Sequence, residues 1–161
     1  MRPLSRRQFI RAGAGVALPL FVPASVLGKN GAVAPSERIT LATLGTGNRC
    51  RRVLEFFMLQ EDVHAAAVCD VRPERLAAGK AMVDKKYGNR DCATYSDQFE
   101  VFARKDIDAV LIATGDRWHS LMSILAAKAG KDIYCEKPNS LYIGEGRAMA
   151  DTIKRYGAVY Q

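Results

Sequence analysis

The segment from residue 36 to residue 70 constrains the fold of this chain most strongly. Its first apolar run, 39–44, predicts a buried strand, and the turn Gly45-Thr46-Gly47-Asn48-Arg49-Cys50 follows directly. An amphipathic run then predicts a helix, and a second apolar strand ends at Asp70. A glycine turn between a buried strand and a helix favours diphosphate binding, because free backbone N–H groups and the positive end of the helix dipole face it.

The individual residues of this segment suit a dinucleotide. Gly45 allows a sharp turn, and Gly47 lacks the Cβ that would keep a pyrophosphate away from the backbone. Asp70 follows Gly45 by 25 residues, and an acid about 20 residues after the turn can hold the ribose hydroxyls. Cys50 occupies the third glycine position, which predicts a slightly wider approach of helix to strand. The segment therefore predicts a dinucleotide-binding domain of the Rossmann type.

The first 28 residues have the features of an export signal and are excluded from the fold. Ser5-Arg6-Arg7-Gln8-Phe9-Ile10 resembles the bacterial twin-arginine signal, and the uncharged stretch 12–28 follows. This stretch is shorter than the roughly 20 apolar residues of a transmembrane helix. We therefore expect no permanent membrane span, and export by the twin-arginine machinery to the periplasm or another extracytoplasmic location. An uncleaved anchor is the alternative, and 29–37 is predicted to be a linker.

Charge and cysteine content exclude two other classes of partner. Most of the formal net charge of +7 comes from four arginines in the first 28 residues, which contain no acid. The remaining charge is ordinary for a soluble domain and gives no reason to expect nucleic-acid binding. The four cysteines form no C-x-x-C pair and the chain has only two histidines, so no metal site is predicted. Cys69 and Cys135 are expected to be buried, unreactive thiols.

Residues 38–161 alternate between strand and helix patterns. The predicted strands are 39–44, 65–69, 93–95, 109–113, 132–135 and 158–161, and the predicted helices are 49–60, 73–87, 97–104, 119–129 and 143–156. This alternation, with apolar strands, predicts an α/β fold: a doubly wound parallel sheet covered on both faces. Ligands bind such sheets outside the carboxyl ends of the strands. The short last strand indicates a domain truncated at its C-terminal end, the front part of a longer protein.

Three polar clusters fall at these strand ends. The first runs from Thr114 to His119, the second is Glu136-Lys137-Pro138, and the third comprises Arg49, Arg51 and Arg52 in the first turn of a helix. Cations at a helix N-terminus oppose the helix dipole, which is easier to tolerate with an anion nearby. The alternative is that these arginines point into solvent.

With these clusters in order, residues 38–161 resemble the Gfo/Idh/MocA family of nicotinamide-dependent oxidoreductases, and in particular its members with a twin-arginine signal. The most specific element is Glu136-Lys137-Pro138 at a strand end. The resemblance implies hydride transfer between NAD, with NADP as the alternative, and a sugar, inositol or related polyol. It also implies that Lys137 is catalytic, polarising a substrate hydroxyl; a surface lysine is the alternative.

The resemblance implies a cofactor site made of Gly45, Thr46, Gly47, Asn48, Arg49, Asp70, Arg72, Thr114, His119, Glu136, Lys137 and Pro138. A carboxylate at Asp70 favours NAD because it repels a 2′-phosphate, whereas Arg72 could stack on the adenine or receive that phosphate. His119 matches a cleft histidine of the family, although a helix-starting histidine with a backbone partner is equally compatible. Gly115 replaces a proline of the family, so the rigidity of that loop is in question.

The 161 residues do not include the family's C-terminal α/β domain, which carries the substrate pocket. We therefore expect this chain alone to be inactive, and a homo-oligomer is compatible with the resemblance. A non-catalytic dinucleotide-binding module is one alternative function. A methyltransferase using S-adenosylmethionine is another, because its first motif also joins a strand to a Gly-x-Gly turn. That motif usually has an acid just before the glycines, where this chain has Thr43 and Leu44.

Overall fold

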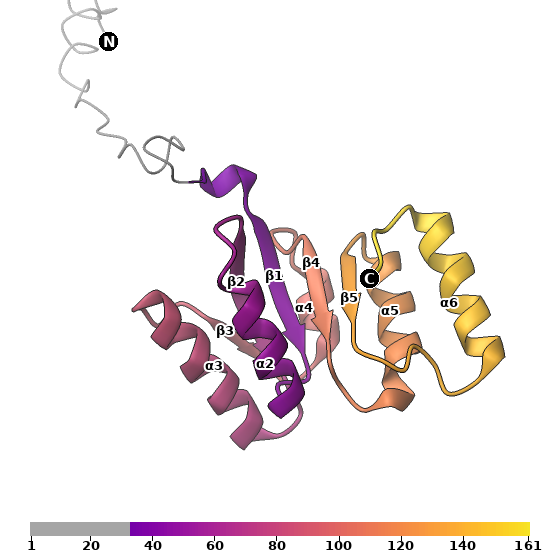
Figure 1. The fold of residues 1–161 in the computed structure, drawn as a ribbon, viewed down its shortest axis with the longest axis horizontal. Coiled ribbons are helices and arrows are strands. Elements are labelled where there is room, and N and C mark those ends of the chain that lie inside the picture. Colours follow the sequence, from indigo (N-terminus) through magenta and orange to yellow (C-terminus); the bar gives the residue numbers. More distant parts are fainter. Residues whose placement is uncertain (1–32) are drawn as a thin grey trace, which may run out of the picture. The chain divides into compact units, whose positions relative to one another are not determined.

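The computed structural model describes residues 33–161 (Figure 1). The predicted export signal lies outside the described residues. The end of the predicted linker contains a short 3₁₀ helix, η2 (Pro35–Glu37), and residues 36–161 form one compact unit. Within the described part of the chain, no helix is long and apolar enough to cross a membrane.

Strands and helices alternate along the chain as predicted. The strands are β1 (Ile39–Leu44), β2 (Val63–Cys69), β3 (Ala93–Tyr95), β4 (Ala109–Ile112) and β5 (Asp132–Cys135). The helices are α2 (Asn48–Phe57), α3 (Pro73–Tyr87), α4 (Gln98–Ala103), α5 (His119–Lys128) and α6 (Ile143–Tyr156), with a 3₁₀ turn, η3 (Asp116–Trp118), before α5. The largest differences from the predicted bounds are an α2 that ends three residues earlier and a β2 that begins two residues earlier.

Local signals set several helix ends. Pro73 occupies the first turn of α3, where its missing N–H costs nothing. The side chain of Asp97 caps α4 by accepting a hydrogen bond from the N–H of Phe99. Gly88 and Gly157 end α3 and α6 in the left-handed conformation, with φ of 67° and 69°.

The five strands form one parallel sheet in the order β3-β2-β1-β4-β5. The predicted sixth strand, 158–161, is present only as a single parallel bridge between Tyr160 and Ile133 of β5. The order reverses between β1 and β4, as in a doubly wound Rossmann sheet, so the predicted fold class is confirmed.

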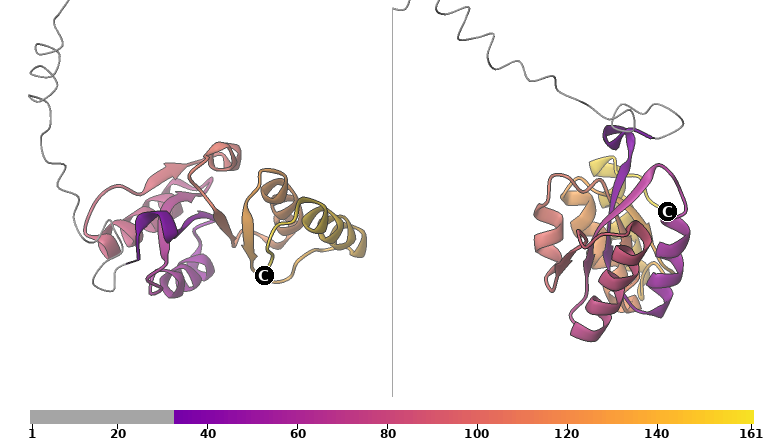
Figure 2. Two further views of the ribbon diagram at one scale, coloured as in Figure 1. Left: turned by 90° about the horizontal axis from the view of Figure 1, so that it is seen from above. Right: turned by 90° about the vertical axis from the view of Figure 1, so that its left-hand side faces the viewer.

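Alternating strand residues build two hydrophobic cores, one on each face of the sheet. In β1, Leu41 packs into the core with side chains of α2 and α3, whereas Ala42 and Leu44 pack into the core with side chains of α4 and α5. Figure 2 shows, from above, helices on both sides of the strands. Burial on both faces explains why the strand sequences are continuously apolar rather than alternating.

The strand register brings all predicted site clusters to one edge of the sheet. Leu44 of β1 lies opposite both Cys69 of β2 and Ile112 of β4, and Ile112 lies opposite Cys135 of β5. The four strands therefore end at the same level. The residues that follow them start the loops of a single carboxyl edge, where doubly wound sheets bind their ligands.

Candidate functional site

The two glycines of the turn after β1 have different structural roles. Gly45 has φ of +83°, and a Cβ there would lie 2.9 Å from both the carbonyl oxygen of Ala113 and the Cγ2 of Thr114. Gly47 has φ of −64°, which any residue adopts, and a Cβ there would meet only Nη1 of Arg75, at 3.7 Å. Gly45 is therefore required by the fold, whereas the bare backbone of Gly47 leaves space above the start of α2.

Asp70 ties the glycine turn to the end of β2. Its side chain is buried, and its Oδ2 accepts hydrogen bonds from the backbone N–H of Thr46 at 2.7 Å and from the Thr46 hydroxyl at 3.2 Å. Its Oδ1 accepts from the backbone N–H of Arg72 at 2.9 Å. A carboxylate has about four acceptor positions, so Asp70 uses three within the chain and keeps about one free.

Helix α3 approaches the same turn closely at Gly79. A Cβ on Gly79 would lie 2.9 Å from Cγ2 of Thr46, which is fully buried beneath the helix. This contact was not predicted from the sequence. A glycine in the middle of a helical pattern is its only local signal, because such a residue lowers helix propensity and indicates a packing requirement.

The third position of the fingerprint accommodates a cysteine. Cys50 is fully buried among the residues that pack beneath α2 and α3, and burial raises the pKa of its thiol to about 12. All four cysteines are free and buried. Burial also raises the pKa of Cys69 to about 12 and that of Cys92 to about 11. The thiols are therefore protonated packing groups, as expected for Cys69 and Cys135.

A cleft of about 360 Å³ opens at the point where the strand order reverses. It is lined by Leu44, Gly45, Cys69, Asp70, Val71, Arg75, Ser96, Gln98, Ala113, Thr114, Gly115, Trp118, Leu121, Met122 and Leu125. Three predicted cofactor residues from three different loops, Gly45, Asp70 and Thr114, thus meet in one cavity. Among the basic residues after β2, Arg75 lines the cleft and Arg72 does not. Arg75 lies in the first turn of α3, and a cation opposing a helix dipole is the signal that could have identified it.

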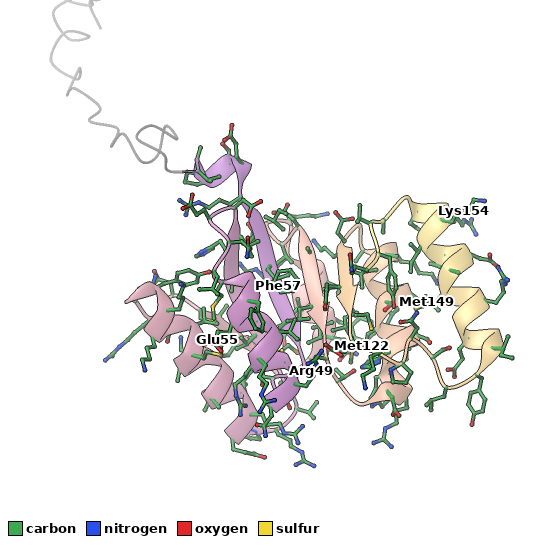
Figure 3. The ribbon with its side chains drawn as sticks, in the orientation of Figure 1. Arg49, Glu55, Phe57, Met122, Met149 and Lys154 are labelled. Atoms are coloured by element: carbon green, nitrogen blue, oxygen red, sulfur yellow. The ribbon has the colours of Figure 1, made fainter. Side chains whose placement is uncertain are left out.

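The second site cluster is joined to the first by an ion pair. Nε and Nη2 of Arg49 lie 2.7 Å and 2.6 Å from Oε1 of Glu136. The Glu136 side chain is 7% exposed, and the hydrogen bond from Arg49 holds the pKa of that carboxyl below its usual value. Figure 3 shows Arg49 at the end of α2 that meets the carboxyl edge of the sheet, and Phe57 at the other end.

The three arginines at the start of α2 have three different surroundings. Arg49 has its anion in Glu136, while Arg51 donates to the carbonyl of Thr46 and to Oδ1 of Asn48. Arg52 is exposed. A protein carboxylate therefore compensates one of the cations that oppose the dipole of α2, and the helix start retains net positive charge.

The loop after β5 is held from the opposite side by α5. Nδ1 of His119 lies 2.7 Å from the carbonyl oxygen of Pro138, and the Ser120 hydroxyl donates to the carbonyl of Asn139 at 2.8 Å. His119 is 2% exposed, and its Nε2 lies 3.3 Å from the carbonyl of Thr114. The histidine thus links two site loops through backbone contacts, which favours the structural interpretation of this residue.

Lys137 and Pro138 are exposed in this loop and are joined by a cis peptide bond. Within the described residues the Lys137 ammonium has no hydrogen-bond or ion-pair partner. In the same part of the chain, no group of three His, Cys, Asp or Glu side chains could hold a metal ion. The edge therefore offers an uncrowded backbone at Gly47, an acceptor at Asp70 and a free cation at Lys137, an arrangement that fits a nicotinamide dinucleotide.

Comparison with known proteins identifies the class to which this fold and site belong. The family described as "Oxidoreductase family, NAD-binding Rossmann fold" matches residues 39–161, and the chain belongs to this family. Residues 39–161 are thus an NAD-binding Rossmann domain. This confirms the resemblance to the Gfo/Idh/MocA family.

The individual relatives are named as different kinds of enzyme. A glycosyl hydrolase family 109 protein of Stenotrophomonas maltophilia is 34% identical over 84% of this chain and 30% of its own length. The D-glucoside 3-dehydrogenase of Escherichia coli is 28% identical over 77% of this chain and 34% of its own. The structure of myo-inositol 2-dehydrogenase from Lactobacillus plantarum has a TM-score of 0.66 at 25% identity, covering 77% of this chain and 35% of that one. The chain thus spans about a third of the length of these relatives.

Proposed function

We propose that this chain is the nucleotide-binding part of an oxidoreductase that transfers hydride between NAD and a sugar, inositol or related polyol. The observation that carries the proposal is the position of Lys137. Its free ammonium follows β5 on the same edge where Gly47 and Asp70 suit a dinucleotide. Relatives named as a glucoside dehydrogenase and an inositol dehydrogenase support a polyhydroxylated substrate.

The chemistry divides between the cofactor and the residues of this chain. NAD, when bound, supplies the hydride acceptor. Gly47 and the start of α2 would hold its pyrophosphate, and Asp70 would accept a hydrogen bond from a ribose hydroxyl. The Lys137 ammonium would stabilise the negative charge that develops on a substrate hydroxyl oxygen as the hydroxyl proton passes to water or another general base and hydride leaves the same carbon for NAD. Thr114 and Glu136 would border the cofactor from the loops after β4 and β5.

The first test separates cofactor binding from turnover. Calorimetry on the 161-residue chain should show NAD binding, while mixtures with a panel of polyols should form no NADH at a useful rate. Catalysis requires the reacting atoms to be held about 3–3.5 Å apart, and one lysine contact does not fix both distance and angle. Absence of NAD binding would refute the proposal, and strong turnover would reveal a substrate site within these residues.

The preference between NAD and NADP is tested at Asp70. Asp70→Ser should relax the preference for NAD, because the carboxylate that repels a 2′-phosphate is removed while Arg75 stays in the cleft. Asp91→Ser, at an exposed acid, is the matched control. An unchanged ratio of the two affinities in folded Asp70→Ser would mean that Asp70 is not the ribose ligand.

A glycoside-cleaving reaction is a second candidate, favoured by the relatives named glycosyl hydrolase family 109. Some NAD-dependent glycosidases cleave glycosides without the usual pair of carboxylates. The predicted longer protein should be given nitrophenyl glycosides and free polyols in parallel. Release of nitrophenol without net NADH would identify a glycosidase, whereas NADH formed in proportion to substrate would identify a dehydrogenase.

We also propose export by the twin-arginine route, on the basis of Arg6 and Arg7. Lysine at both positions should retain the protein in the cytoplasm, because the export machinery recognises the arginine pair. Replacement of Arg2 by lysine, outside the pair, is the control. Equal periplasmic recovery of the double variant and the parent would contradict the proposal.

A further inference from the structure

The ion pair between Arg49 and Glu136 joins two segments that are 87 residues apart in the chain. Both nitrogens that Arg49 uses converge on one oxygen, Oε1, while Oε2 lies 3.3 Å from the backbone nitrogen of Lys137. The carboxylate is therefore folded back toward the residue that follows it. The hydrogen bond from Arg49 is the main cause of the lowered pKa of Glu136, and the Lys137 ammonium adds only a weaker, longer-range attraction. That ammonium has no hydrogen-bond or ion-pair partner among the described residues.

Few charged groups compete for this carboxylate. The titratable and charged groups that act on Glu136, or on which it acts, are Arg49 and Cys50 from α2, Cys135 from β5 and Lys137 from the loop. The two thiols are buried with raised pKa values and so carry no charge. Two cations remain, and Arg49 makes the hydrogen-bonded contact. A planar guanidinium, with several N–H donors, makes more specific hydrogen bonds to a carboxylate than the ammonium of a lysine does.

We propose that Arg49 is a positioning residue that occupies the Glu136 carboxylate and so keeps the Lys137 ammonium unpaired and available to a substrate hydroxyl. The use of that ammonium rests on the proposed function, whereas the competition itself does not. A buried carboxylate that loses its partner must find another, because an uncompensated buried charge is strongly unfavourable. The flexible four-carbon stem of Lys137 starts at the residue that Oε2 already contacts, so its ammonium is the nearest replacement.

The fold does not depend on Arg49 for holding this loop. His119 and Ser120 contact the carbonyls of Pro138 and Asn139 from α5, and the N–H of Glu136 donates to the carbonyl of Ile112 at 2.9 Å. These anchors remain when Arg49 is changed. The Arg49 side chain is itself 64% exposed. The variant that lacks this arginine should therefore stay folded at neutral pH, and the consequence of the loss there should appear at Lys137.

The test measures the rate at which an amine-selective acylating reagent labels Lys137 in the 161-residue chain, with peptide mass spectrometry as readout. Lys154, exposed on α6 (Figure 3), serves as the internal reference. Arg49→Gln should slow labelling of Lys137 between about three-fold and ten-fold, because an ion-paired ammonium is less available to react. Arg52→Gln, a neighbouring exposed arginine on the same helix, should leave the rate unchanged.

The double variant Arg49→Gln with Glu136→Gln decides the mechanism. With no carboxylate to capture the ammonium, labelling of Lys137 should return to the parent rate. Thermal melting of each variant verifies that it is folded. Two outcomes would overturn the proposal: an unchanged Lys137 rate in folded Arg49→Gln, or a double variant that labels as slowly as the single one. Neither outcome depends on NAD or turnover, so failure here is distinguishable from failure of the proposed function.

Discussion

Alanine substitution at Gly45 and at Gly47 should have opposite effects on stability, and the substitution at Gly47 should weaken cofactor binding. Gly45 has φ of +83°, and its added Cβ would meet two backbone atoms of the loop after β4 within 3.0 Å. A non-glycine residue in this conformation costs on the order of 1–3 kcal/mol. The contact is with backbone, so it cannot be relieved by a side-chain rotation and adds to that cost.

Gly47 lacks both sources of strain. Its φ of −64° is ordinary, and its Cβ would have 3.7 Å of space to the nearest atom, the end of a flexible arginine. Replacing a glycine in a compatible conformation typically stabilises by about 0.4–1 kcal/mol, because the unfolded chain loses freedom. The same methyl group would stand where the pyrophosphate approaches the backbone, so NAD affinity should fall by about ten-fold or more.

The assays are thermal melting without cofactor and calorimetry with NAD. Gly45→Ala should lower Tm by several degrees, since roughly 1 kcal/mol corresponds to about 2–8 °C in domains of this size range. Gly47→Ala should melt at or slightly above the parent temperature and bind NAD weakly. The reasoning is refuted if Gly45→Ala melts like the parent, or if folded Gly47→Ala binds NAD as tightly as the parent does.

Further outcomes follow from single contacts. Gly115→Pro should stabilise the fold by about 0.4–1 kcal/mol, because φ of Gly115 is already −71° and its N–H donates to no acceptor within the described residues. Urea unfolding measures this effect, and a lower urea midpoint than that of the parent would contradict the prediction. Lys131→Met should destabilise the fold by about 2–3 kcal/mol, because the buried Lys131 ammonium donates hydrogen bonds to two backbone carbonyls. An unchanged urea midpoint would show that water donates to these carbonyls in place of the ammonium. The hydrogen bond from Arg49 lowers the pKa of Glu136 in the folded protein below its value in the unfolded chain. The ionised carboxylate therefore stabilises the fold at pH values above the unfolded-state pKa. This contribution is lost as the pH falls through the lower pKa of the folded state. Acid titration of Arg49→Gln should therefore show unfolding at higher pH than the parent does, and identical midpoints would count against this coupling.

Local sequence patterns determined the elements and the location of the site. Continuous apolar runs predicted β1 to β5, and the glycine turn with Asp70 predicted where a dinucleotide would bind. These inferences succeeded because strand and helix periods, caps and turns depend on residues within a few positions of one another. The carboxyl edge then followed from the alternation of strands and helices, since parallel strands all end on one side.

Tertiary structure alone decided which side chains meet at that edge. The partner of Arg49 is 87 residues away, and it is adjacent only because β1 and β5 flank β4 with their ends in register. The three-dimensional arrangement also shows that Arg75 lines the cleft instead of Arg72, and that His119 faces backbone carbonyls. The different roles of Gly45 and Gly47 also depend on the loop after β4, whose first residues approach only the first glycine. Such pairings depend on sheet order and register, which no short stretch of sequence encodes.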